Sequence, residues 1–185
     1  AIVDGKKNDH GQIELTVLDA GKGAEQGAVI NYYLAAPEGL PPAADAKSSL
    51  AFLDAAGNLI REFTPKPADY DKLDDKDKAL DPGPWMPVQA GMNRFVWDLR
   101  HAGATKLRGN KTAGEANNGR CVLPGAYQVR LTVGDTVATE AFAVVNDPRV
   151  TTPAAVLATQ DALLQEIYGK LSSLYESLAT LRDVR

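Results

Sequence analysis

Apolar and polar side chains alternate along the first 150 residues in short runs that predict β-strands. The clearest alternation covers residues 127–133, and a Gly-Asp pair then turns the chain into another apolar run. Residues 93–100 alternate in the same way and place Phe95 and Trp97 on one face, which we expect to point into a core. The other runs lie at 13–18, 29–35, 50–54, 59–63 and 136–145. Seven short strands separated by turn residues are typical of an Ig-like antiparallel β-sandwich.

A helical period replaces this alternation after residue 150. Thr152 and Pro153 are residue types that favour the start of a helix, and Gly169 is the one helix-weakening residue that follows them. The main apolar residues of this segment alternate spacings of three and four, as in the a/d seam of a coiled coil. They are Leu164, Ile167, Leu171, Leu174, Leu178 and Leu181.

The predicted helix is too long for the predicted sandwich to cover. A helix over residues 151–185 spans roughly 50 Å, whereas a strand of seven residues spans roughly 23 Å. The leucine seam therefore needs a further partner, and three remain open: missing domains or a second helix of the same full-length chain, a second copy of the chain in a homodimer, or another protein. We interpret the segment as part of a helical hairpin or a coiled coil.

These patterns divide the chain into three parts. Residues 1–26 form an N-terminal lead-in with one strand, residues 27–150 the sandwich, and residues 151–185 the amphipathic helix. Two long connections interrupt the strands: residues 64–90 are rich in proline and charge, and residues 102–124 are rich in glycine. Connections of this length are either binding surfaces or plain surface insertions, and both interpretations stay open here.

Composition excludes several classes of function. The chain has 185 residues, which fits one ordinary domain, and its 20 basic and 24 acidic side chains give a net charge of -4. This charge offers no footprint for nucleic acid, so we expect no nucleic-acid partner. No apolar run reaches the roughly 18 residues of a transmembrane helix, so we expect no membrane partner.

The residues show no arrangement that we recognise as catalytic or metal-binding. Cys121 is the single cysteine, and we expect it to be a small buried filler. His101 follows a predicted strand, where a histidine is usually a turn residue. The carboxylates of residues 69–81 alternate with lysines, which predicts a solvated loop that neutralises its own charge, and their spacing does not complete a calcium loop. We therefore expect no catalytic residue, no metal and no cofactor.

A binding function is the alternative that these residues leave open. Aromatic residues make up only 6% of the chain, and Trp85 is the tryptophan that does not lie in a strand. It either faces outward to bind a glycan or peptide, together with the long loops 64–90 and 102–124, or plugs its own loop onto the sandwich.

Three stretches carry a resemblance to a known family. Residues 91–100 read Gly-Met-Asn-Arg-Phe-Val-Trp-Asp-Leu-Arg, and residues 123–131 read Leu-Pro-Gly-Ala-Tyr-Gln-Val-Arg-Leu. Together with residues 27–34, they resemble the C-terminal region of exported bacterial proteins with sortilin-type (BNR-repeat) β-propellers, which are often labelled glycosyl-hydrolase-like. In that family a sandwich similar to the Ig-like domain of the flagellar hook-cap protein follows the propeller.

The resemblance implies a structural role rather than an activity. It implies a non-catalytic accessory or assembly module of a larger protein in the periplasm or outside the cell, with any hydrolase activity in an upstream domain. We expect no signal peptide within these 185 residues. The signature residues that the resemblance implies are Phe95, Trp97, Asp98, Pro124, Gly125 and Tyr127. Of these, Tyr127 resembles a tyrosine-corner residue, whose hydroxyl bonds a nearby backbone group.

Overall fold

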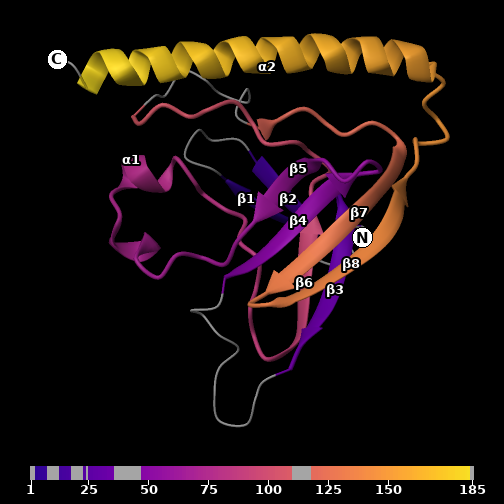
Figure 1. The fold of residues 1–185 in the computed structure, drawn as a ribbon, viewed down its shortest axis with the longest axis horizontal. Coiled ribbons are helices and arrows are strands. Elements are labelled where there is room, and N and C mark those ends of the chain that lie inside the picture. The colour runs from indigo at the N-terminus through magenta and orange to yellow at the C-terminus, as the bar shows by residue number, and fades with distance from the viewer. Residues whose placement is uncertain are drawn as a thin grey trace.

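We describe the fold from a computed structural model of the chain. The structure describes residues 3–7, 13–17, 23, 25–35, 47–109 and 118–183. The described chain is mainly sheet, with one long C-terminal helix (Figure 1). The prediction of a mainly β fold followed by a helix is therefore confirmed.

The sandwich consists of two antiparallel sheets. The smaller sheet pairs β3 with β6, and the larger has the strand order β5-β4-β7-β8. The strands of the sandwich are β3 (Ala28–Leu34), β4 (Ser48–Asp54), β5 (Leu59–Phe63), β6 (Gly91–Trp97), β7 (Gly125–Val133) and β8 (Thr136–Val144). The predicted count of seven strands is wrong for the sandwich, which has six among the described residues.

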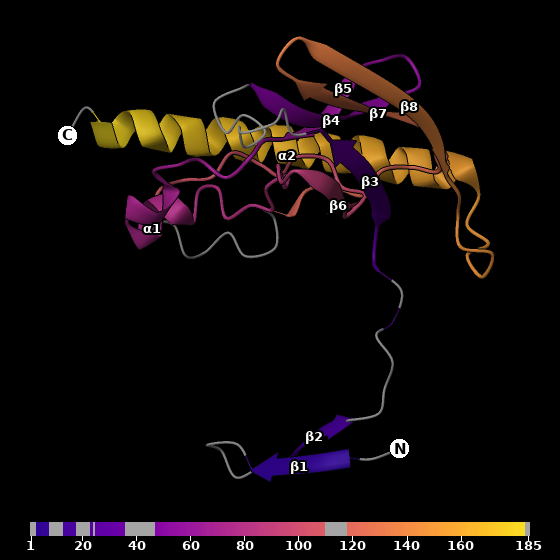
Figure 2. The same cartoon turned by 90° about the horizontal axis from the view of Figure 1, so that it is seen from below.

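The seventh predicted strand lies in a separate hairpin. β2 (Ile13–Val17) pairs with β1 (Val3–Lys7), a strand that the sequence pattern does not predict. The two strands form their own two-stranded sheet, apart from both sheets of the sandwich (Figure 2). An apolar run therefore identified a strand correctly but gave no information about the sheet to which it belongs.

The core of the sandwich is aromatic. Trp97 is fully buried and stacks on Phe52 of the opposite sheet, with 4.2 Å between the ring centroids. Phe95 is buried as well and packs against Phe63, so both predicted inward positions of β6 are confirmed. The indole Nε1 of Trp97 donates to the carbonyl oxygen of Arg100 at 3.0 Å, which satisfies the polar atom of a buried ring.

Two predicted strand ends differ in the structure. The predicted strand 93–100 ends at Trp97, because Leu99 adopts a φ of 57°, in the left-handed region that interrupts a strand. The turn between β7 and β8 is as predicted, with Gly134 at a positive φ of 58° and Val133 opposite Thr136. Local turn chemistry thus sets the hairpin that closes the larger sheet.

The helix α2 (Ala154–Asp183) lies across one end of the sandwich rather than on a sheet face (Figure 1). The sheets lie toward the Ala154 end of α2, and its C-terminal half extends over the long loops. The carbonyl oxygen of Pro153 accepts the first helical bond, from the Leu157 N–H. The helix therefore begins about one residue later than its sequence predicts.

The loop 64–90 contains two short helical turns. They are η1 (Tyr70–Lys72) and α1 (Asp75–Lys78), and the carboxylate of Asp74 caps α1 by accepting from the Asp77 N–H. The loop is tied to the sandwich near its end, where Met86 is buried and its N–H donates to the carbonyl oxygen of Thr64.

Candidate functional site

The helix α2 exposes a straight row of apolar side chains. We call this row the apolar column and define it as Val156, Leu163, Ile167, Leu174 and Leu181, whose exposed fractions are 54%, 58%, 49%, 53% and 66%. At about 100° per residue, the five positions fall within about 40° of arc on the helix surface. The column is therefore a straight row of exposed apolar side chains along most of α2.

The predicted leucine seam divides between this column and the inner side of the helix. Ile167, Leu174 and Leu181 belong to the column, whereas the other seam residues are half-buried. Those half-buried residues are Leu164, Leu171 and Leu178. The prediction that the sandwich alone does not cover the seam holds only for the outer half of it. The inner half lies on the side of the helix that is held by the glycine-rich loop 102–124.

Polar contacts fasten the inner side of α2 to the glycine-rich loop. Arg120 forms an ion pair with Asp161, and their side chains are only 15% and 18% exposed. Farther along the helix, the Thr105 N–H donates to the Ser172 hydroxyl at 3.0 Å, and the Thr105 hydroxyl bonds the carboxylate of Glu176. These contacts fix which side of the helix faces the protein and so leave the apolar column outside.

Near its end, the glycine-rich loop packs closely at Gly119 against the backbone of residues 101–102. Gly119 has a φ of 74°, and a Cβ there would lie 2.1 Å from the carbonyl oxygen of His101. Arg120 directly follows Gly119, and its carbonyl oxygen accepts a hydrogen bond from the His101 N–H. This bond fixes the backbone of Arg120 at the place where its guanidinium reaches Asp161 of α2. Burial, helped by the nearby charge of Arg120, lowers the pKa of His101 and favours its neutral form. Any substitution at Gly119 would therefore shift the part of the loop that contacts α2 through Arg120.

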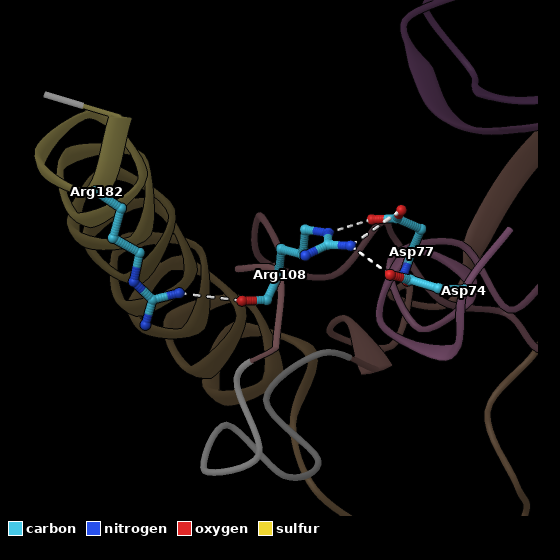
Figure 3. A network of polar contacts seen from close by, with 4 residues as sticks. All are labelled: Asp74, Asp77, Arg108 and Arg182. Atoms are coloured by element: carbon cyan, nitrogen blue, oxygen red, sulfur yellow. Dashed lines mark hydrogen bonds and ion pairs between the residues drawn. The ribbon is translucent and has the colours of Figure 1, made fainter. Parts of the chain in front are cut away.

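The two long loops and the helix meet at Arg108 (Figure 3). The guanidinium of Arg108 forms ion pairs with Asp74 and Asp77, and its carbonyl oxygen accepts from Arg182 of α2 at 3.0 Å. The hydrogen bond from the Asp77 N–H lowers the pKa of Asp74, and the positive charge of Arg108 lowers it further. Together with a Lys66 pair that lowers the pKa of Asp71, this keeps carboxylates of the acidic stretch ionised. The sequence predicts that lysines within residues 69–81 neutralise the carboxylates of this stretch. In the structure, Lys66 and Arg108, which lie outside the stretch, neutralise three of these carboxylates.

Trp85 lies half-buried inside its own loop. Its ring meets that of Tyr70 edge to face, with 4.4 Å between centroids, and the Lys66 ammonium lies 5.8 Å from its centre. Its Nε1 is buried and has no hydrogen-bond partner among the described residues. The Trp85 ring therefore packs against its own loop, and its indole N–H is an unsatisfied hydrogen-bond donor.

A groove runs beside Trp85 between the two long loops. It is made of two adjoining hollows of about 310 and 340 Å³. Both are lined by Arg61, Asp81, Gly83 and Ala102, while Trp85 lines one and Lys106 the other. Loops 64–90 and 102–124, which the sequence names as candidate binding surfaces, therefore contribute to one groove. Its lining combines carboxylates, cations and an aromatic ring.

The remaining signature residues make structural contacts. The Tyr127 hydroxyl donates to the carbonyl oxygen of Leu123, four residues upstream, across the turn that contains Pro124 and Gly125. The carboxylate of Asp98 pairs with Arg61 at 3.2 Å and accepts from the Arg100 N–H. These contacts stabilise turns and loops of the sandwich.

The candidates for chemistry are dispersed. Cys121 is exposed, so the expectation of a buried filler is wrong; it lies in an isolated bridge opposite Arg100, at the edge of the sandwich, where its side chain points to solvent. Within the described ranges, no three or more His, Cys, Asp or Glu side chains gather as metal ligands would. None of the helices described is long and apolar enough to span a membrane.

Sequence reasoning missed the residues that hold α2 in place. Arg108, Arg120 and Asp161 are single charges in a loop and on a helix, and no local pattern marks them as partners. It also missed Val156 and Leu163, which are seven residues apart and lie eleven and four residues before Ile167, at nearly the same angle around the helix. That spacing was the available signal for the column.

Comparisons of the chain with protein-family models, with curated proteins and with solved structures each found no match. The geometry of the sandwich, the groove and the helix therefore carries the functional argument.

Proposed function

We propose that this chain is a non-catalytic accessory module of a larger exported protein with a β-propeller, and that it mediates contacts between domains or proteins. The observation that carries the proposal is the apolar column, because exposed apolar side chains aligned along one side of a helix are costly to leave in water and typically mark an interaction site. On this proposal the module works in the periplasm or outside the cell.

The titratable groups support a non-catalytic role. General acid–base catalysis by carboxylates uses a pair whose pKa values are pushed apart, with one raised toward neutral pH. The pKa values of Asp54, Asp71 and Asp74 are instead lowered by hydrogen bonds from turns, caps and a lysine. These carboxylates are committed to structural contacts.

The Ig-like assignment of the sandwich rests on two contacts. The bond from the Tyr127 hydroxyl to Leu123, upstream of β7, has the form of a tyrosine corner. The buried Trp97 between the sheets occupies a place like that of the core tryptophan in Ig domains. With the motifs at 91–100 and 123–131, they support the relation to the sandwich that follows sortilin-type propellers.

Two experiments test the proposal: sequencing of the whole gene, and an assay of the purified chain for hydrolase activity. We expect the reading frame to encode β-propeller repeats upstream of this segment, with an export signal, and we expect the purified chain to turn over no glycoside, ester or peptide of a broad substrate panel. A reading frame without a propeller contradicts the accessory role. Turnover by this chain, lost when Asp81 or Glu62 is replaced, contradicts the non-catalytic role.

The groove beside Trp85 favours a second candidate function, binding of a glycan or a peptide. Saccharide and peptide sites combine aromatic faces with convergent polar groups, and this groove offers Trp85 with Arg61, Asp81 and Lys106. Binding on a glycan or peptide array that Trp85→Ala abolishes would support this candidate. Tyr33→Ala, which removes an exposed aromatic ring on β3, is the control that should leave such binding unchanged.

A further inference from the structure

Four of the five residues of the apolar column are symmetric about the middle of α2, whereas Ile167 has Lys170 at its matching position. Leu163 and Leu174 lie equally far from the point between Tyr168 and Gly169, and so do Val156 and Leu181. Two such helices laid side by side in opposite directions therefore bring Leu163 of each copy to Leu174 of the other, and Val156 to Leu181. Self-complementarity of this kind is what a two-fold symmetric interface requires.

The charges beside the column favour the same arrangement. Glu166 and Lys170 form an ion pair of 2.6 Å within the helix, on either side of the midpoint, and both are exposed. In an antiparallel pair of helices, Glu166 of one copy faces Lys170 of the other. In a parallel pair, the flank that carries Glu166 and Lys170 would instead face the opposite flank of the other helix, so this pairing between copies would not form.

The shape of the molecule leaves room for this pairing. The sheets of the sandwich lie toward the Ala154 end of α2, whereas loop segments and the short helix α1 lie toward the opposite end (Figure 1). An antiparallel pair therefore carries its two sandwiches toward opposite ends, whereas a parallel pair would place them next to each other. The contacts of Asp161, Ser172 and Glu176 hold the other side of each helix on its own chain.

We propose that α2 is a homodimerisation helix, which pairs antiparallel with α2 of a second copy of this chain through the apolar column. This inference rests on the proposed interaction role and names the partner. The column is roughly 38 Å long and a helix is roughly 10 Å wide, so two copies bury about 800 Å² of facing surface. Stable interfaces bury roughly 1,200–2,000 Å², so the dimer is weak and forms at high protein concentration or high local concentration.

The first test measures mass against concentration. Sedimentation velocity of the whole chain, from micromolar to millimolar concentration, should show the average mass rising toward twice that of one chain. Leu174→Lys should abolish this rise, because it places a charge in the column. Gln165→Lys makes the same charge change at an exposed position on the opposite side of α2 and should leave the rise unchanged.

A charge exchange then tests the direction of pairing. Leu163→Glu alone and Leu174→Lys alone should each weaken the dimer by at least tenfold, and the variant with both changes should recover most of it. Positions 163 and 174 are roughly 16 Å apart along one helix, so the recovery arises between copies. Both positions are exposed, and thermal melting of each variant should match that of the natural chain.

The outcomes separate this inference from the proposed function. A monomer at every concentration, or a dimer that Leu174→Lys leaves intact, overturns self-pairing. A dimer that the double variant fails to recover overturns the antiparallel arrangement. None of these results bears on the reading frame or on the turnover panel, which test the accessory role separately.

Discussion

The sandwich and the helix solve the problem of apolar surface in opposite ways. The sandwich closes around Phe52, Trp97 and their aromatic neighbours, and its two largest core rings have no exposed surface. The helix α2 buries one side on the loops at the end of the sandwich and leaves the apolar column, with exposed fractions near one half, in solvent. The difference shows that burial on all sides holds the sandwich together, whereas the helix combines one buried side, which includes Tyr175, with polar contacts to Arg120 and Thr105.

This contrast also separates the residues that stabilise the fold, in the core of the sandwich, from the exposed residues of the column, which are available to bind a partner. Removing core area should destabilise the whole chain, and cutting a helix contact should release α2 with a smaller loss. Changing the column should alter association and leave stability as it is.

The largest effect is expected at Trp97. Trp97→Ala should lower the free energy of unfolding by about 3–5 kcal/mol, because the ring is fully buried and stacks on Phe52. Urea denaturation measures the loss. Trp85→Ala, the same substitution at a half-buried ring, is the matched control and should cost clearly less. Equal losses at the two positions would contradict the division between a closed core and a loop plug.

A medium effect is expected where the helix is fastened. Arg120→Ala should leave Asp161 without its cation beneath α2 and cost about 1–3 kcal/mol, less than a fully buried pair because both side chains keep some exposure. Hydrogen exchange should show loss of protection in α2 and little change in β4 and β7. Arg149→Ala removes an exposed pair with Asp147 and serves as the control, with no change expected. Unchanged protection of α2 in Arg120→Ala would show that the helix is held by other means.

A smaller effect is expected at the turn before β7. Tyr127→Phe removes the bond to the carbonyl oxygen of Leu123 and should cost about 0.5–1.5 kcal/mol. Denaturation of Tyr33→Phe, where the hydroxyl is on an exposed side chain, provides the baseline. Equal midpoints for the two variants would argue against a tyrosine corner.

The smallest effect is a pH dependence from His101. Its pKa is lowered in the folded chain, so the unfolded chain takes up a proton first as pH falls below about 6.5. The contribution of His101 is complete above that pH and is lost as pH falls toward its folded value. Denaturation at pH values between about 5.5 and 7, above the range in which most ordinary carboxylates titrate, should show the start of this decline, and His101→Gln should flatten it. A decline equally steep in the variant would assign it to another group.

Much of the sandwich was predictable because its signals are local. The alternation of β6 and the Gly-Asp turn between β7 and β8 each depend on neighbours in the sequence, and both match the structure. Partners distant in the sequence carry no such signal. The pairing of β1 with β2, the exposed position of Cys121 and the ion pair of Arg120 depend on where remote segments meet.

The helix illustrates the same limit within one element. Its seven-residue spacing predicted an apolar seam, and the apolar residues do line the helix. Which half of that seam is covered depends on Gly119 and on the loop that carries Arg120, and neither is visible in the period of the helix. The candidate site was thus predicted as a set of residues but not as a surface.

The most direct test of the account is a distance between two copies of α2. Thr180→Cys, in a chain with Cys121→Ser, places one spin label on an exposed position outside the column. Double electron–electron resonance at high concentration should then give a distance of roughly 35 Å or more, because position 180 lies far from the midpoint of an antiparallel pair. A distance of roughly 10–20 Å would indicate parallel helices. That distance, or the absence of any dipolar signal, would contradict the account.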